Sequence, residues 1–220
     1  MMLNKNSYIG GLNYSMKNIK TLKLVQLAIL VALLFILAFT PLGYLRFAAI
    51  SITFMMLPVV LGSVLLGPTY GAILGFFFGL TSFLQCFGID PFGTALFSLS
   101  PLLTACLCFI PRILMGWISG LIFKGFNKLN NKSILSFAVA SISGALLNTI
   151  LFVGMLIICF GNNEALYSIL SLSENSIWLL ITTFITINAI VEAAACLLIG
   201  TPLTKVLYKY RAENLAANNK

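Results

Sequence analysis

The chain has 220 residues, of which 60% are hydrophobic and only 8% are charged, and its mean hydropathy is +1.05. A soluble domain carries about 25% charged residues, so the composition excludes an ordinary soluble protein and predicts an integral membrane protein. The net charge of +8 is concentrated in a few segments, where membrane topology and contact with anionic lipid explain it without a nucleic-acid partner.

Six apolar segments are predicted as transmembrane helices, because a helix that crosses a bilayer needs ~20 largely apolar residues. In chain order they are residues 22–40, 49–66, 68–86, 102–123, 134–160 and 176–200. Pro41 and Gly43 end the first, Gly67-Pro68 forms a turn before the third, and two long segments, 87–101 and 161–175, follow the third and the fifth. The first helix is long and lacks a small-residue cleavage site, so we expect it to be retained.

The basic residues between these segments predict the orientation in the membrane, because cytoplasmic loops carry an excess of Lys and Arg. Lysine and arginine gather on one side of the six spans, at Lys5, Lys17, Lys20, Lys23, Lys124, Lys128, Lys132, Lys205, Lys209, Arg211 and Lys220. The other side has Arg46 with three acidic residues, Asp90, Glu164 and Glu174. The predicted fold is all-α, a bundle of six transmembrane helices with both termini in the cytoplasm. Residues 1–21 form a basic N-terminal segment, 22–208 the membrane domain and 209–220 a tail.

Small residues recur every four positions in three of the predicted spans, a spacing that lets helix backbones approach closely in lipid. In the third and fourth spans they are Gly71, Gly75, Gly79, Gly116 and Gly120, which we interpret as internal packing of the bundle. In the first span they are Ala28 and Ala32. Because a first helix lies at the edge of a bundle, this pair serves either internal packing or the docking of another protein.

Polar side chains inside the last three spans indicate a site. A carboxylate at the bilayer centre costs roughly 2.5–3.5 kcal/mol, and such residues mark sites or pathways. Glu192 and Asn188 are one helical turn apart, so they share a face. At ~1.5 Å rise per residue, Arg112, Asn148 and Asn188 each lie roughly 12–16 Å below the outer boundary, with Glu192 about one turn deeper. Gln85 lies closer to the outer end of its span.

Two interpretations of this polar level remain open. In the first, Arg112 and Glu192 form a buried structural ion pair bridged by amides. In the second, the side chains line a pocket that opens outward under the two long loops and holds a small polar molecule. The second is favoured because buried ion pairs stabilise poorly compared with apolar packing of similar size. The planar guanidinium of Arg112 would then bind a carboxylate or phosphate through paired hydrogen bonds.

The sequence offers little support for catalysis or cofactors. It contains no histidine, which excludes a Ser-His pair or a histidine metal site. Its five cysteines, Cys86, Cys106, Cys108, Cys159 and Cys196, lie mostly in apolar runs without CxxC spacing, as small buried hydrophobic residues do. We therefore expect no metal and no cofactor. An intramembrane enzyme and a self-sufficient secondary carrier remain as alternatives, although six spans without an obvious inverted repeat disfavour the carrier.

Four stretches of the sequence carry a resemblance to a known family. They are LPVVLGSVLLGPTYGAILGFFFGLTSFLQCFGIDPFG (57–93), PRILMGWISGLIFK (111–124), SGALLNTILFVG (143–154) and NAIVEAAACLLIG (188–200). Together they resemble the substrate-binding, or S, component of energy-coupling-factor (ECF) vitamin transporters, over about residues 20–208. The Gly67-Pro68 turn and the Pro111-Arg112 pair are the most specific marks.

The resemblance implies a multi-pass protein of the prokaryotic plasma membrane. It would bind a vitamin from outside with high affinity and dock on a transmembrane T component driven by two ATP-binding subunits. It implies that Ala28 and Ala32 form the docking surface. It also places substrate binding on the last three helices and the outer loops, where Arg112, Asn148, Asn188 and Glu192 lie, and we add Gln85 on the third span to the predicted substrate-binding residues. The pantothenate-type branch is most similar, with riboflavin and folate as alternatives. Because the sequence has no GxxxxGK[ST] motif, ATP hydrolysis would belong to the partners.

Overall fold

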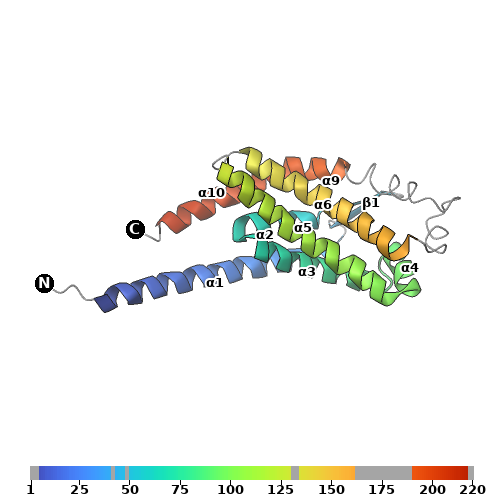
Figure 1. Ribbon diagram of the computed structural model, residues 1–220, viewed down its shortest axis with the longest axis horizontal. Coiled ribbons are helices and arrows are strands. Elements are labelled where there is room, and N and C mark those ends of the chain that lie inside the picture. The colour runs from blue at the N-terminus through green and yellow to red at the C-terminus, as the bar shows by residue number, and fades with distance from the viewer. Residues whose placement is uncertain (1–4, 41–42, 48–49, 130–133, 162–189, 218–220) are drawn as a thin grey trace.

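The computed structural model describes residues 5–40, 43–47, 50–129, 134–161 and 190–217. Its elements in chain order are α1 (Lys5–Ala38), β1 (Tyr44–Phe47), β2 (Ile50–Thr53), α2 (Met56–Leu66), α3 (Pro68–Gln85), α4 (Pro91–Leu99), α5 (Pro101–Leu129), α6 (Ile134–Phe160), α9 (Ile190–Ala195), the π-helical segment Cys196–Gly200 and α10 (Thr201–Ala217). Figure 1 shows a bundle in which the start of α1 and the end of α10 lie at one end, while α4 and β1 lie toward the other.

The helical character of the predicted bundle is confirmed, and within the described residues three helices are long and apolar enough to cross a membrane. They are Lys20–Ala38, Pro101–Lys128 and Ile134–Phe160. The third predicted span corresponds to the 18-residue helix α3. The sixth predicted span, 176–200, lies within the described residues only from 190 onward. Six crossings, the cytoplasmic placement of both termini and the domain boundaries stay predictions.

The start of the second predicted span was wrong, and this adds a β-hairpin to the fold predicted as all-α. Residues 49–66 were expected to form one helix, but helix α2 begins only at Met56 and has 11 residues. Before it, β1 and β2 pair antiparallel, with Tyr44 opposite Thr53 and Phe47 opposite Ile50. In β2, isoleucine alternates with Ser51 and Thr53. This period of two is typical of a strand, and an average of hydropathy over the segment does not detect it.

The segment 87–101, expected to be a loop, contains the nine-residue helix α4. Asp90 is its N-cap, and its Oδ2 atom accepts a hydrogen bond of 2.8 Å from the backbone N–H of Gly93. Pro91 follows at the first helical position, where a missing N–H costs nothing. An aspartate followed by proline is a helix-start signal, so this helix could have been predicted.

The small-residue repeat of α3 packs directly on α5, which confirms internal packing for these glycines. A Cβ atom added at Gly71 or Gly75 would collide with backbone carbonyls of α5, at Gly116 and Arg112 respectively. A Cβ atom at Gly79 would lie 2.8 Å from the carbonyl oxygen of Cys108. The two backbones therefore touch at three positions along about two turns of α3. This contact fixes the position of the α5 turn that carries Arg112.

Gly75→Ala is expected to destabilise the protein, because the added methyl group has only backbone atoms to displace, including Cα of Ile113 at 2.9 Å. Overpacking of this kind costs about 1–3 kcal/mol. Gly154→Ala in α6 is the matched control, because nothing lies within 4 Å of the position its Cβ atom would take. Thermal unfolding of the two purified variants in detergent tests the prediction. Equal unfolding midpoints would show that α3 and α5 are not in close contact at Gly75.

The described residues form two clusters of buried apolar side chains. The larger joins α1, α2, α3, α5 and α6 and includes Leu34, Leu74, Phe78, Met115 and Phe137. The smaller consists of Leu96 on α4, Leu107 on α5, and Leu156 and Phe160 on α6. Because Leu96 and Leu107 also line a polar cavity, the smaller cluster anchors α4 as one wall of that cavity.

Candidate functional site

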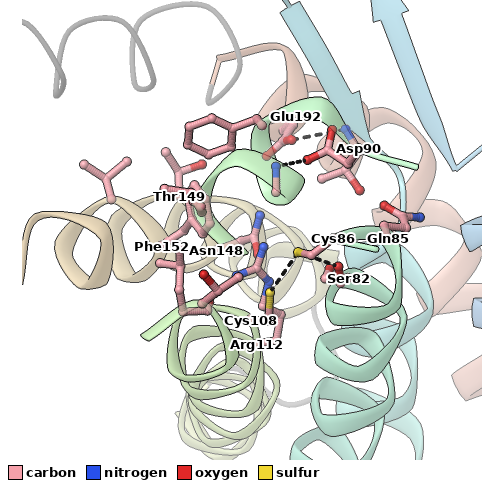
Figure 2. Close-up of a pocket in the computed structure, with 17 residues that line it drawn as sticks. Ser82, Gln85, Cys86, Asp90, Cys108, Arg112, Asn148, Thr149, Phe152 and Glu192 are labelled. Carbon is pink, nitrogen blue, oxygen red and sulfur yellow. Dashed lines mark hydrogen bonds between the residues drawn. The ribbon is translucent and has the colours of Figure 1, made fainter. Parts of the chain in front are cut away.

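A cavity of about 180 Å³ lies between β2, the end of α3, α4, α5, α6 and α9. Its walls combine apolar side chains with polar ones from segments far apart in the sequence. The polar side chains are Thr53, Ser82, Gln85, Asp90, Thr104, Arg112, Asn148, Thr149 and Glu192. Figure 2 shows Arg112, Asn148, Glu192 and the two cysteines Cys86 and Cys108 around this space.

The Pro111-Arg112 pair explains how a cation is held at this depth. In a helix, the carbonyl of Leu107 would accept a hydrogen bond from the N–H of residue 111, but proline has no N–H. The side chain of Arg112 supplies the missing donor, since its Nη1 atom donates to the Leu107 carbonyl at 2.6 Å. Pro111 thus leaves the Leu107 carbonyl free to accept, and the hydrogen bond to this carbonyl holds the guanidinium against the side of the cavity that Leu107 lines.

Two aromatic rings hold the same guanidinium from neighbouring helices. Its Cζ atom lies 4.7 Å from the ring centroid of Phe152 on α6 and 5.6 Å from that of Phe78 on α3. Both distances are within the ~6 Å range of cation–π attraction. The Nε atom of Arg112 is buried and has no hydrogen-bond partner. The side chain is therefore held in place while one donor remains unused.

Glu192 and Asn148 bring acceptors to the same cavity. Glu192 is only 4% exposed, and its Oε1 atom accepts a 3.2 Å hydrogen bond from the backbone N–H of Thr53. This bond ties α9 to the end of the hairpin. Asn148 is 8% exposed, and its Oδ1 atom is buried without a partner. Among the described residues, no hydrogen bond or ion pair within 4 Å joins Arg112 directly to Glu192. Arg112 donates to a backbone carbonyl, and Glu192 accepts from the backbone N–H of Thr53 and is hydrogen-bonded to the Asn148 side chain.

Gln85 links the cavity to the first helix. Its Nε2 atom donates a 2.8 Å hydrogen bond to the carbonyl of Ala38, the last residue of α1. The side chain is 4% exposed and lines the cavity. The amide N–H group of Gln85 therefore joins α3 to α1.

The structure brings four of the five predicted substrate residues to one cavity: Arg112, Asn148, Glu192 and Gln85. Asn188 lies outside the described residues. Their role as substrate ligands stays a prediction. Sequence reasoning did not identify Thr53, Asp90 or Phe152 as part of the site. The Asp90-Pro91 helix start was a usable signal for Asp90, whereas Thr53 contributes through its backbone and Phe152 through packing, which the sequence does not reveal.

The predicted docking residues lie elsewhere. Ala28 and Ala32 are both exposed on α1, whereas Leu30 and Leu34 on the same helix are 7% and 0% exposed and pack into the larger apolar cluster. At 3.6 residues per turn, the alanines face away from the buried leucines. The structure therefore gives the alanine pair no packing role inside the described bundle.

The chemical groups of the cavity would suit a small molecule with both an anionic group and hydrogen-bond donors. Arg112 offers a fixed cation with a free donor, and Asn148 and Glu192 offer oxygen acceptors. Among the described residues, no group of three or more His, Cys, Asp and Glu side chains gathers to hold a metal ion. Binding of an organic ligand is the chemistry that the described geometry supports.

Glu192→Gln is expected to weaken ligand binding by only roughly fivefold, about 1 kcal/mol, because glutamine keeps one oxygen to accept from Thr53. The variant loses the negative charge that a ligand hydroxyl or amide would use. Titration calorimetry on the purified variant measures the change. A variant that fails to fold would show instead that the carboxylate is needed for structure.

Comparison with known proteins gives a consistent result. The family model described as ECF transporter, substrate-specific component, matches residues 22–204. The pantothenic acid transporter PanT of Lactococcus lactis subsp. cremoris (strain MG1363) is 28% identical over 168 residues, which cover 72% of this chain and 79% of that protein. The pantothenate transporter PanT of Leuconostoc mesenteroides subsp. mesenteroides is 30% identical over 193 residues, which cover 80% of this chain and 93% of that protein.

Proposed function

We propose, given that this chain belongs to the family of ECF transporter substrate-specific components, that it binds pantothenate with high affinity and serves its uptake into the cell. The chain is a multi-pass protein of the cell membrane. The observation that carries the proposal is the Arg112 side chain, which is fixed in a cavity by a backbone carbonyl and two aromatic rings while its Nε atom lacks a partner.

The polar groups of the cavity match the chemistry of pantothenate. This vitamin has a carboxylate, a central amide and two hydroxyl groups. We expect Arg112 to bind the carboxylate, since a guanidinium offers paired donors in one plane. Asn148 and Glu192 would accept hydrogen bonds from the amide or the hydroxyls. Two curated relatives bear the name of pantothenate transporters, which supports this choice of vitamin.

Transport would require partners. Family membership supports association with a transmembrane T component and two ATP-binding subunits, and the chain itself has no nucleotide-binding GxxxxGK[ST] motif. In this proposal the chain binds the vitamin alone, and ATP hydrolysis in the partners drives its release into the cell. A secondary carrier would instead transport without them.

A thermal-shift comparison tests the ligand. Purified protein is heated with pantothenate, riboflavin or folate, and we expect only pantothenate to raise the unfolding midpoint, because a ligand stabilises the state that binds it. Stabilisation by riboflavin or folate instead would overturn the choice of vitamin. Uptake of labelled pantothenate in a host that lacks the ATP-binding subunits tests the partners. Undiminished uptake there would identify a secondary carrier.

A further inference from the structure

Two cysteine thiols meet at the wall of the cavity. Cys86 follows the last residue of α3, and Cys108 lies on α5. Their sulfur atoms are 3.9 Å apart, and both thiols are free. They are 22 positions apart in the sequence and lack CxxC spacing, so only the packing of α3 on α5 brings them together. Figure 2 shows the pair beside Arg112.

The surroundings of the pair hold the two sulfurs facing each other. Cys86 is seven residues after Gly79, the glycine whose backbone touches α5 at the carbonyl of Cys108. Seven residues are about two helical turns, so Gly79 and Cys86 share one face of the chain. The thiol of Cys86 also donates to the carbonyl of Ser82 at 3.4 Å. Both residues are buried from bulk solvent, yet both line the cavity.

We propose that Cys86 and Cys108 form a redox modification site, a dithiol that a small oxidant entering the cavity converts to a disulfide. The oxidant is a low-molecular-weight disulfide. One thiol, after loss of its proton, attacks the oxidant and releases one small thiol. The second protein thiol then displaces the other small thiol and closes the Cys86–Cys108 bond. In sum, two S–H bonds and one S–S bond are exchanged for one S–S bond and two S–H bonds.

The disulfide would change the cavity itself. A disulfide has an S–S length of about 2.05 Å, so the sulfurs must approach from 3.9 Å, and Cys86 loses its hydrogen bond to Ser82. Cys86 also contacts the start of α4, because a Cβ atom at Gly93 would lie 2.7 Å from its sulfur. Cys108 precedes Arg112 by one helical turn. Oxidation therefore moves the wall between α4 and the arginine, and we expect it to lower pantothenate affinity at least tenfold. This consequence rests on the proposed function, whereas disulfide formation does not.

The test uses the full chain with Cys106→Ser, Cys159→Ser and Cys196→Ala, so that the pair alone remains. The purified protein is treated with bis(2-hydroxyethyl) disulfide, a small disulfide, or with diamide, which takes up the two hydrogen atoms, and is then denatured and labelled with a maleimide mass tag. We expect two tags before oxidation, none after it, and two again after reduction. Matched variants that also carry Cys86→Ser or Cys108→Ser should form no intramolecular disulfide.

Peptide mapping of the oxidised unmutated chain supplies a second measurement that does not depend on the substituted protein folding. A peptide linked through Cys86 and Cys108 is expected. If both cysteines are instead recovered as labelled free thiols after oxidation of the folded protein, the proposal is overturned. Pantothenate affinity is then compared between oxidised and reduced protein. Unchanged affinity would overturn the effect on the cavity. If reduced protein binds no vitamin, the proposed function fails while the disulfide result stands.

Discussion

Arg112→Ala is expected to abolish vitamin binding, by more than a hundredfold, while the protein still inserts into the membrane. Among the described residues that line the cavity, Arg112 carries the only positive charge, and its Nε atom has no hydrogen-bond partner. A hydrogen bond to a charged group contributes about 1.5–3 kcal/mol, and a paired carboxylate contact uses two of them. Titration calorimetry with pantothenate measures the loss. Tight binding by the purified variant would show that the ligand does not use this arginine.

The alanine variant also removes the donor to the Leu107 carbonyl, so its effect on folding needs its own control. An unsatisfied buried acceptor costs about 1–3 kcal/mol, which lowers stability without preventing insertion. Arg112→Lys separates the two effects, because a lysine ammonium can still donate to that carbonyl but lacks the planar fork that binds a carboxylate. We expect the lysine variant to be nearly as stable as the parent and still to bind poorly. Tight binding by the lysine variant would show that the positive charge is sufficient and that the paired hydrogen bonds of the guanidinium are not needed.

Pro111 enters the same argument as a positioning residue. In Pro111→Ala the new N–H can bond to the Leu107 carbonyl, which then no longer depends on Arg112. The guanidinium would lose one of the contacts that fix it, while its stacking on Phe152 remains. We expect binding to weaken, but less than in Arg112→Ala, and the helix to become more stable because an interior proline is removed. Affinity and thermal unfolding, measured together, distinguish this result from general damage.

The sequence predicted the structure correctly where the evidence was local to one helix, either a pattern on one helix face or the length of one apolar run. The Gly71, Gly75 and Gly79 repeat predicted a close helix contact, and α3 makes that contact with α5. The fifth predicted span, 134–160, coincides with α6. Composition failed at residues 50–55, because an apolar run can be a strand when polar residues alternate in it. It also failed at 87–101, where a short capped helix resembles a loop in composition.

The sequence predicted the polar residues of the candidate site but not the residues that contact them. Arg112, Asn148 and Glu192 stood out because polar groups are rare at that depth in a membrane. Counting residues placed Arg112 and Asn148 at one level and Glu192 about one turn deeper. Their partners depend on three-dimensional packing. The bond from Thr53 to Glu192 spans 139 positions, and the meeting of Cys86 with Cys108 requires α3 against α5. No local pattern in the sequence contains such information.

Ala28→Trp or Ala32→Trp is expected to stop transport and leave pantothenate binding intact. Both alanines lie on the exposed side of α1, opposite Leu30 and Leu34, which pack inside the bundle. A partner helix that approaches α1 closely in lipid needs small residues at this spacing. Trp at either position would hold the partner helix away, while the cavity draws its walls from β2, α3, α4, α5, α6 and α9.

Two measurements on each variant decide the outcome: pantothenate affinity of the isolated chain, and co-purification with the T component and the ATP-binding subunits. Ile158→Trp is the matched control, because Ile158 is 80% exposed and lies on α6 rather than on α1. Since this control places the same bulky ring on another lipid-exposed face, it should keep both assembly and affinity.

Lost affinity with retained assembly would place the alanine pair in internal packing. Lost assembly with retained affinity would mean that the chain binds its vitamin alone and needs its partners only to move it. The bond between Gln85 and Ala38 joins α1 directly to a cavity-lining side chain, and the larger apolar cluster packs α1 on α3. We therefore expect any small change of affinity in the Ala28 and Ala32 variants to be transmitted through these contacts.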